Sequence, residues 1–316
     1  KTQEALLKTD VAILLFTDTF GDMEKAWAET CKTKKIPVLP VQNKTDLGEN
    51  KEAAEEAARV CGKSTLSVSA KNGEGFDAVR MALTPYATEE RSITGRVTKP
   101  GDHVVLVMPQ DASAPRGRLI MPQVQTIREL LDRGCTATCT TPERLSSVFS
   151  KCATPPDLVI TDSQVFAAVY EQIPSGVPLT SFSVLLADAK GDAKTFLAGA
   201  EVIETLRPTD RILIAEACTH APASEDIGRV KIPALLRKKV GAELSVDVVA
   251  GDDFPKDLSS YSLIIHCGAC MFNRRHVLSR IAAAEAQGVP ITNYGMTIAK
   301  LTNILDKVII PGRDTE

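Results

Sequence analysis

Leu263-Ile264-Ile265-His266-Cys267-Gly268-Ala269-Cys270 joins an apolar run to a cysteine cluster. An earlier stretch has the same outline, because Ile212-Leu213-Ile214-Ala215 is soon followed by Cys218-Thr219-His220. Short apolar runs bounded in this way predict buried strands. Ligands bind at the carboxyl edge of an open α/β sheet, so these two strand ends can meet around one metal centre.

The three cysteines of these clusters, Cys218, Cys267 and Cys270, suit two kinds of metal centre. With a histidine they could form a Cys3His zinc site, or they could hold a 4Fe-4S cluster with one iron left open. The spacing alone does not choose between them. A thiol–disulfide pair at Cys267 and Cys270 would explain the C-x-x-C spacing but would leave Cys218 and both histidines without a role.

The plainest alternative is two packed strand ends with incidental cysteine and histidine side chains. We interpret the remaining cysteines in that way, because none of them has a neighbour at ligand spacing: Cys31, Cys61, Cys135, Cys139 and Cys152. His103 and His276 likewise carry no motif.

Composition excludes several classes of protein. With 316 residues, 44% of them hydrophobic, the chain is long enough for two or three cores. A net charge of −3 and no basic stripe make nucleic acid an unexpected partner. No apolar run reaches membrane-spanning length. The start shows no signal-peptide pattern, so we expect a cytoplasmic protein with reduced thiols or metal ligands.

The N-terminal part contains a guanine-reading motif. A buried strand at 11–16, an amphipathic helix at 23–33 and a strand at 36–41 lead into Asn43-Lys44-Thr45-Asp46. In such an N-K-x-D loop, Asp46 can accept both N–H groups of the guanine edge, Asn43 holds the loop, and Lys44 lays its stem along the base. On its own this loop could equally be a polar turn.

A second loop of the same kind supports the guanine interpretation. After a helix at 50–60 and a short strand comes Ser69-Ala70-Lys71, an S-A-K loop in which a backbone N–H meets the guanine oxygen. No G-x-x-x-x-G-K-[ST] loop is found, and no D-x-x-G loop precedes the strand at 11–16, so little would position a γ-phosphate or its Mg²⁺. We therefore expect residues 1–90 to be the second half of a P-loop GTPase domain, inactive in GTP hydrolysis by itself.

A small block follows a helix at 76–83 and a polar linker at 88–101. It contains a strand at 103–108, a loop at 109–117, a helix at 123–132 and a strand at 136–140. A unit of this size buries little apolar surface, so we expect it to pair with a copy of itself or to pack on a neighbour. We assign it to residues 91–155.

From residue 156 to 316, strands and helices alternate. Strands are predicted at 157–160, 211–215, 245–249, 261–265 and 289–292, and helices at 163–172, 193–206, 229–239, 274–287 and 296–307. This alternation predicts a doubly wound parallel sheet. Cys270 precedes the helix at 274–287, whose N-terminal dipole favours a thiolate.

These motifs together resemble one family, the FeFe-hydrogenase maturation GTPases known as HydF. The resemblance covers essentially the whole chain, and it depends on guanine loops and the C-x-H and H-C-x-x-C pattern occurring together. It implies an α/β protein of three domains: a partial P-loop GTPase domain at 1–90, a dimerisation domain at 91–155 and an iron–sulfur domain at 156–316. It also implies a 4Fe-4S cluster on Cys218, Cys267 and Cys270, with GTP and Mg²⁺ bound by the full-length protein.

The resemblance further implies a scaffold or carrier that works as a homodimer. Two radical-SAM maturases supply the precursor of the di-iron subcluster, and the carrier delivers it to the FeFe-hydrogenase apoprotein. GTP would modulate the exchange of partners. Two other classes stay open, a regulatory GTPase with a structural Cys3His zinc site and an interaction scaffold without metal.

Three thiolates leave one iron of a cubane without a protein sulfur. Residues within reach of that iron in the sequence are His220, His266, Glu216, Glu225 and Asp226. Either histidine could instead hydrogen-bond a cluster sulfur or a backbone carbonyl. On an extended strand His266 and Cys267 point to opposite sides, which favours this second role for His266.

Overall fold

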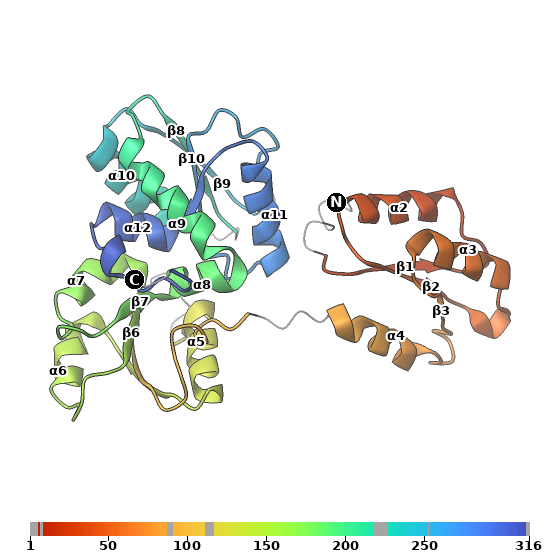
Figure 1. Ribbon diagram of the computed structural model, residues 1–316, viewed down its shortest axis with the longest axis horizontal. Helices are drawn as coiled ribbons and strands as arrows, with labels where there is room; N and C mark the ends of the chain where they lie inside the picture. Colours follow the sequence, from red (N-terminus) through yellow and green to blue (C-terminus); the bar gives the residue numbers. More distant parts are fainter. Residues whose placement is uncertain are drawn as a thin grey trace. The chain divides into compact units, whose positions relative to one another are not determined.

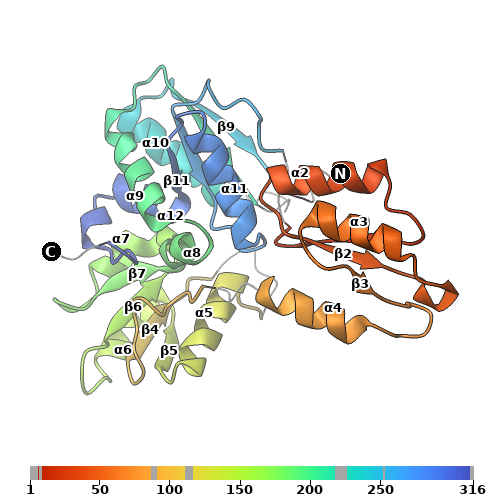
Figure 2. The same cartoon turned by 45° about the vertical axis from the view of Figure 1, so that its right-hand side comes forward.

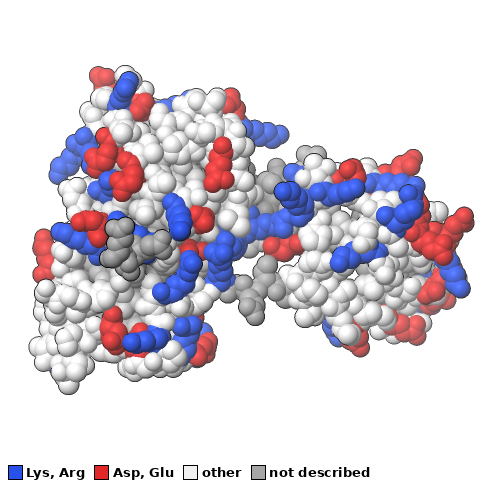
Figure 3. Space-filling view, viewed as in Figure 1, with Lys and Arg blue, Asp and Glu red and all other residues white. Residues whose placement is uncertain are grey.

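The computed structural model describes residues 6, 9–86, 91–110, 117–217, 226–251 and 253–313. The protein is an α/β protein with three parallel sheets. The chain divides into two compact units, Lys1–Glu90 and Arg91–Glu316 (Figure 1). Lys and Arg side chains are interspersed with Asp and Glu over the face seen in Figure 3, as suits a net charge of −3.

The first unit contains a three-stranded sheet in the order β1-β2-β3. Its strands are β1 (Ala12–Phe16), β2 (Val38–Gln42) and β3 (Leu66–Ser67), and its helices are α2 (Asp22–Thr33), α3 (Lys51–Cys61) and α4 (Phe76–Leu83). The elements predicted here are confirmed. The expectation that β1 is fully buried is wrong, because Ile13 and Leu15 are 47% and 56% exposed. β1 lies at the edge of the sheet, and the described part of the unit leaves one of its faces open.

The second unit begins with a four-stranded sheet in the order β5-β4-β6-β7. The strands are β4 (His103–Val107), β5 (Thr136–Thr140), β6 (Leu158–Thr161) and β7 (Leu179–Ser181). Val104 and Leu106 face a core formed with α5 (Met121–Asp132) and α8 (Phe182–Lys190). Val105 and Val107 face the opposite side, where α6 (Leu145–Phe149) and α7 (Phe166–Tyr170) pack.

Two sequence-based assignments need correction here. β6 does not open the C-terminal sheet but pairs in parallel with β4, with Val105 opposite Val159. The strand β7 and the helices α6 and α8 were not predicted at all. The expected boundary at residue 155 therefore falls between β5 and β6 of one sheet. The division of the chain into three domains stays a prediction.

The expected linker is also partly wrong, because its described part, residues 91–101, packs on the first sheet of the second unit. Ile93 and Val97 contact the core between β4 and α5. Thr94 is fully buried. The carboxylate of Glu129 accepts hydrogen bonds from Ser92 Oγ at 2.6 Å and from the backbone N–H of Ile93 at 2.7 Å. These contacts make the segment part of the folded unit.

The second sheet of this unit has the order β11-β10-β8-β9. Its strands are β8 (Arg211–Ala215), β9 (Ser245–Val249), β10 (Leu263–His266) and β11 (Ile291–Asn293). The helix α10 (Ile232–Val240) covers the face that includes Ile212 and Ile265, and α11 (Arg274–Glu285) covers the face that includes Leu213 and Ile264. This is the two-sided arrangement that the alternation predicts, but it begins at β8 rather than at residue 156.

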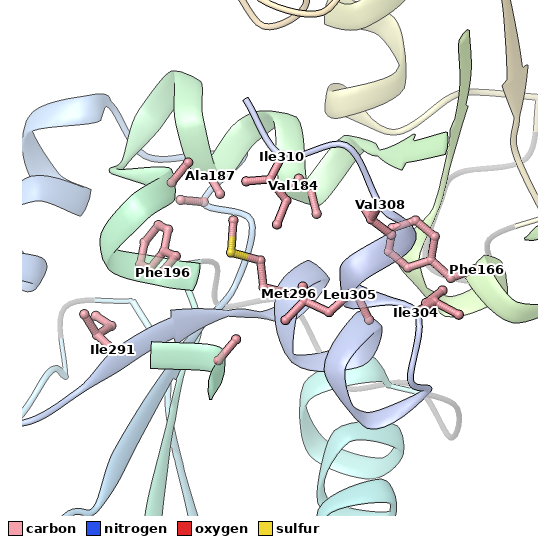
Figure 4. Close-up of a cluster of buried hydrophobic side chains, with 14 of the residues drawn as sticks. Phe166, Val184, Ala187, Phe196, Ile291, Met296, Ile304, Leu305, Val308 and Ile310 are labelled. Carbon is pink, nitrogen blue, oxygen red and sulfur yellow. The ribbon is translucent and has the colours of Figure 1, made fainter. Parts of the chain in front are cut away.

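The two sheets of the second unit share one hydrophobic core. Figure 4 shows Met296 of α12 (Tyr294–Leu301) among Val184 and Ala187 of α8 and Phe196 of α9 (Ala193–Glu201). In Figures 1 and 2, α8 lies between the β5-β4-β6-β7 sheet and the helices α9, α11 and α12. The middle block therefore packs on a neighbour, which is one of the two outcomes expected from its size.

Candidate metal centre and guanine loops

β8 and β10 are adjacent parallel strands, and their connections leave on opposite faces of the sheet. Such a switch point opens a crevice at the carboxyl ends of the two strands. Ala215 lies opposite His266 in the register, so residues 216–217 and 267–270 leave the sheet at the same edge. The backbone N–H of Ala217 donates to Cys267 Sγ at 3.0 Å. The residue before Cys218 thus contacts the Cys267 thiol.

Three of the predicted site residues lie outside the described part of the chain: Cys218, His220 and Glu225. Within the described part, no group of three His, Cys, Asp or Glu side chains is placed to hold a metal ion.

Cys267 has a setting that suits a metal-bound sulfur. Its Sγ accepts backbone N–H groups from Ala217 at 3.0 Å and from Ala269 at 3.4 Å. Burial nevertheless raises the pKa of the thiol to about 11. A metal would therefore have to displace the thiol proton on binding. Backbone donors to sulfur are among the features that tune protein iron–sulfur clusters, so the residues present fit such a group.

Cys270 lies in the loop between β10 and α11, residues 267–273. Ala269, in the middle of this loop, has a left-handed φ of 52° although it is not a glycine. The Nζ of Lys190 donates to the carbonyl of Cys270 at 3.0 Å. Asn273 then caps α11 by accepting the His276 N–H at 3.0 Å. The loop conformation is thus held by polar contacts on both sides of Cys270.

His266 is fully buried, and both of its ring nitrogens have partners. Nε2 lies 2.9 Å from Nη1 of Arg280, and Nδ1 lies 2.7 Å from the carbonyl oxygen of Cys267. Arginine can only donate, so Nε2 accepts and Nδ1 carries the proton. Burial, reinforced by the Arg280 charge, lowers the pKa of His266 to about 3. This arrangement favours the hydrogen-bonding role for His266 over that of a fourth ligand.

Arg280 brings a buried positive charge to the same place. Its guanidinium donates to the carbonyls of Gly251 and Glu216 and lies over the rings of Phe254 and Phe272 at 4.8 and 5.1 Å. Among the influences on the pKa of the Cys267 thiol, the Arg280 charge acts to lower it. Arg280 therefore favours negative charge on the sulfur.

The acidic residues Glu216 and Asp226 are engaged by Arg229. Oε2 of Glu216 accepts from Nε and Nη2 of Arg229 at 3.1 and 2.9 Å, and its side chain is 5% exposed. Asp226 accepts the Arg229 N–H at 2.8 Å and caps the π-helical turn Ile227–Lys231. In this arrangement the Glu216 carboxylate binds the Arg229 side chain, and the Asp226 carboxylate accepts a backbone N–H at the start of the π-helical turn.

The guanine loops of the first unit lie side by side. Asn43 Oδ1 accepts the Ala70 N–H at 3.0 Å, and Asp46 Oδ1 accepts the Ser69 hydroxyl at 2.8 Å. Asp46 Oδ2 lies 3.7 Å from Lys71 Nζ. Lys44 has a left-handed φ of 62°. The structure thus joins the two loops, and one backbone donor of the S-A-K loop, the Ala70 N–H, is already bonded to Asn43.

Two family models match the second unit. Residues 93–191 match the hydrogen maturase F dimerization domain, and residues 194–311 match the hydrogen maturase F tetramerization domain. The chain belongs to the hydrogen maturase F family. None of the curated proteins matches it. In the part of the chain that the structure describes, every helix is too short or too polar to cross a membrane.

The two matched segments, 93–191 and 194–311, adjoin between α8 and α9. The end of α8 contacts residues 267–273, which we call the cysteine loop. Sequence analysis missed two residues of the site, Arg280 on α11 and Lys190 at the end of α8; Lys190 was missed because α8 itself was not predicted. Its signals were Ser181, whose Oγ accepts the Val184 N–H at 3.2 Å as a helix cap, and the apolar run that follows.

Proposed function

We propose that this protein is an iron–sulfur scaffold and carrier in the maturation of FeFe-hydrogenase. Cys218, Cys267 and Cys270 would hold a 4Fe-4S cluster at the switch point between β8 and β10. The observation that carries the proposal is the 3.0 Å contact of the Ala217 N–H with Cys267 Sγ, since it brings the chain next to Cys218 onto the Cys267 thiol. Membership in the hydrogen maturase F family supports the cargo.

The side chains around the cysteines have separate roles in this proposal. Backbone N–H groups of Ala217 and Ala269 orient the Cys267 sulfur, and Arg280 offsets the negative charge of the thiolates. His266 fixes Arg280 and the start of the loop through its two hydrogen bonds. With three thiolate ligands, the cluster supplies one open iron to which a precursor can bind. His220 and Glu225 remain the proposed ligands of that iron.

The guanine loops would regulate the exchange of partners. Asp46 offers two carboxylate oxygens to the N–H groups of guanine, and the contact of Asn43 with Ala70 keeps the two loops together. GTP with Mg²⁺ would bind when the domain is complete. The radical-SAM maturases would load the precursor, and the apo-hydrogenase would receive it. The matches to a dimerization domain and a tetramerization domain support a homodimer or a larger homo-oligomer.

Anaerobic reconstitution with iron and sulfide tests the cluster. The wild-type protein should show the visible and EPR spectra of a 4Fe-4S cluster. Cys218→Ser, Cys267→Ser and Cys270→Ser should each lose most of the bound iron, because an alkoxide is a poor ligand for this centre. Cys139→Ser, on the exposed Cys139 of β5, is the matched control. Full iron content in Cys267→Ser would sink the assignment, and a colourless wild-type protein with stoichiometric zinc would favour a structural zinc site.

A further inference from the structure

Lys190 binds the cysteine loop through three carbonyl groups. Its Nζ donates to the carbonyl oxygens of Ala269 and Cys270 at 3.0 Å and of Phe272 at 3.1 Å. An ammonium group has three N–H donors, which equals the number of these bonds. All three carbonyls lie between Cys267 and α11, so a single side chain sets the path of the backbone through Cys270.

The loop needs such support because of its backbone. Ala269 has φ of 52°, a region that residues with a Cβ rarely adopt, and it is buried. With the loop in this conformation, the Ala269 N–H reaches Cys267 Sγ while its carbonyl reaches Lys190. Ala269 therefore makes both contacts. Its carbonyl oxygen accepts from Lys190, which holds the loop, and its N–H donates to the Cys267 sulfur, which orients that sulfur.

A second cation joins the same two elements without touching the cysteine loop. Nη1 of Arg274, at the start of α11, donates to the carbonyls of Asp188, Ala189 and Gly191 at 3.3, 3.2 and 2.6 Å. These carbonyls lie at the end of α8. Lys190 and Arg274 thus reach in opposite directions across one junction, and only Lys190 contacts the residues between the two thiols.

We propose that Lys190 is a positioning residue that holds the Cys267–Cys270 loop ready to bind metal and stabilises negative charge there. This inference rests on the proposed function, in which both cysteines are cluster ligands. Lys190 lies in the segment that matches the dimerization domain, and its three acceptors lie in the segment that matches the tetramerization domain. A residue of the dimerization segment therefore holds a loop that belongs to the tetramerization segment.

The effect on charge separates this role from simple packing. A cation beside the cluster favours its reduced, more negative state. Lys190→Met should therefore make the reduction potential more negative, whereas Lys190→Arg, which keeps the charge, should leave it near the wild-type value. Arg274→Gln loosens the same junction and should leave the potential nearer to the wild type than Lys190→Met does.

The experiment compares the full-length wild-type protein with Lys190→Met, Lys190→Arg, Arg274→Gln and Lys194→Met; the last of these changes an exposed lysine four residues along. In the metal-free proteins, the rate at which iodoacetamide alkylates Cys270 is followed by mass spectrometry. We expect an increase of about tenfold in Lys190→Met, because the loss of three charge-assisted hydrogen bonds loosens the loop around the thiol. This gain outweighs the loss of the cation, which by itself would slow alkylation by disfavouring the thiolate. Little change is expected in Lys194→Met. Circular dichroism checks that each variant folds. After reconstitution, iron retention and the reduction potential are measured.

Equal alkylation rates in Lys190→Met and Arg274→Gln, with equal potentials, would overturn the inference and leave Lys190 as ordinary packing. A Lys190→Met protein that matches the wild type in alkylation, iron retention and potential would overturn it as well. If the wild-type protein takes up no iron, the proposed function fails. The alkylation rates would still decide whether Lys190 holds the loop.

Discussion

Replacing His266 should change how the stability of the metal-free protein depends on pH. The ring is fully buried, and the ionisable groups around it are Arg280 and His276 on α11 and the neighbouring Cys267. Its pKa falls from 6.5 to about 3, mainly through burial and then through the Arg280 charge. The unfolded chain therefore binds a proton at His266 near pH 6.5, whereas in the folded protein this ring stays neutral until the pH approaches about 3.

The sign and size of the effect follow from this difference. Where the unfolded state binds more protons, stability rises with pH, so the stabilisation by neutral His266 is complete above the unfolded pKa and is lost as the pH falls towards the folded value. Each pH unit below the unfolded pKa costs about 1.4 kcal/mol, so a change from about pH 7.5 to about pH 5 should cost about 2 kcal/mol through this group.

The assay is urea-induced unfolding of the metal-free protein, followed by circular dichroism at both pH values. His266→Gln is expected to be less stable at neutral pH but to lose about 2 kcal/mol less on acidification than the wild type. His103→Gln is the matched control, since His103 is only partly buried and bonds Thr138 Oγ1 at 2.9 Å. If wild type and His266→Gln lost the same stability on acidification, the ring would not be held neutral by its surroundings.

Three further outcomes are expected from contacts in the structure. Asp46→Asn, in a protein with a complete GTPase domain, should weaken binding of a fluorescent guanine nucleotide by about 2–4 kcal/mol and spare the cluster; unchanged affinity would remove this loop as the base reader. Glu129→Gln should lower the free energy of unfolding by about 1–3 kcal/mol, since the amide nitrogen replaces one of the two acceptor oxygens, so either the Ile93 N–H or the donors of Ser92 and Thr94 lose their partner; an unchanged urea midpoint would contradict this. Gly199→Ala should lower the melting temperature, because a Cβ at this position would lie 2.1 Å from the carbonyl oxygen of Ile291. A stable Gly199→Ala protein would show that α9 and β11 can separate at little cost.

The strand pattern could be predicted from sequence where apolar runs are isolated. The bounds of β5, β8 and β9 match the prediction, because each run is flanked by polar or turn residues. β7 and α8 were missed because a strand of three residues passes directly into an apolar helix with no loop between them. Periodicity cannot separate such elements.

Pairing between strands was the harder problem. β6 resembles the strands of the C-terminal sheet in composition, yet its partner is β4, and nothing in a local window records that choice. For the candidate site, the spacing of the cysteines and the strand ends predicted the edge of the sheet. The contacts of Lys190 and Arg280 join residues that are far apart in the sequence, so no sequence motif predicts them.

The core shared by the two sheets affects how fragments of this protein behave. A fragment that begins at α9 would carry all three cysteines that we propose as cluster ligands, yet it would leave Phe196, Met296 and Val308 without Val184 and Ala187 of α8. Exposed apolar surface of that kind promotes aggregation. A fragment meant to fold on its own should therefore start ahead of β4, and a fragment trimmed to the cysteine-bearing half is expected to be insoluble.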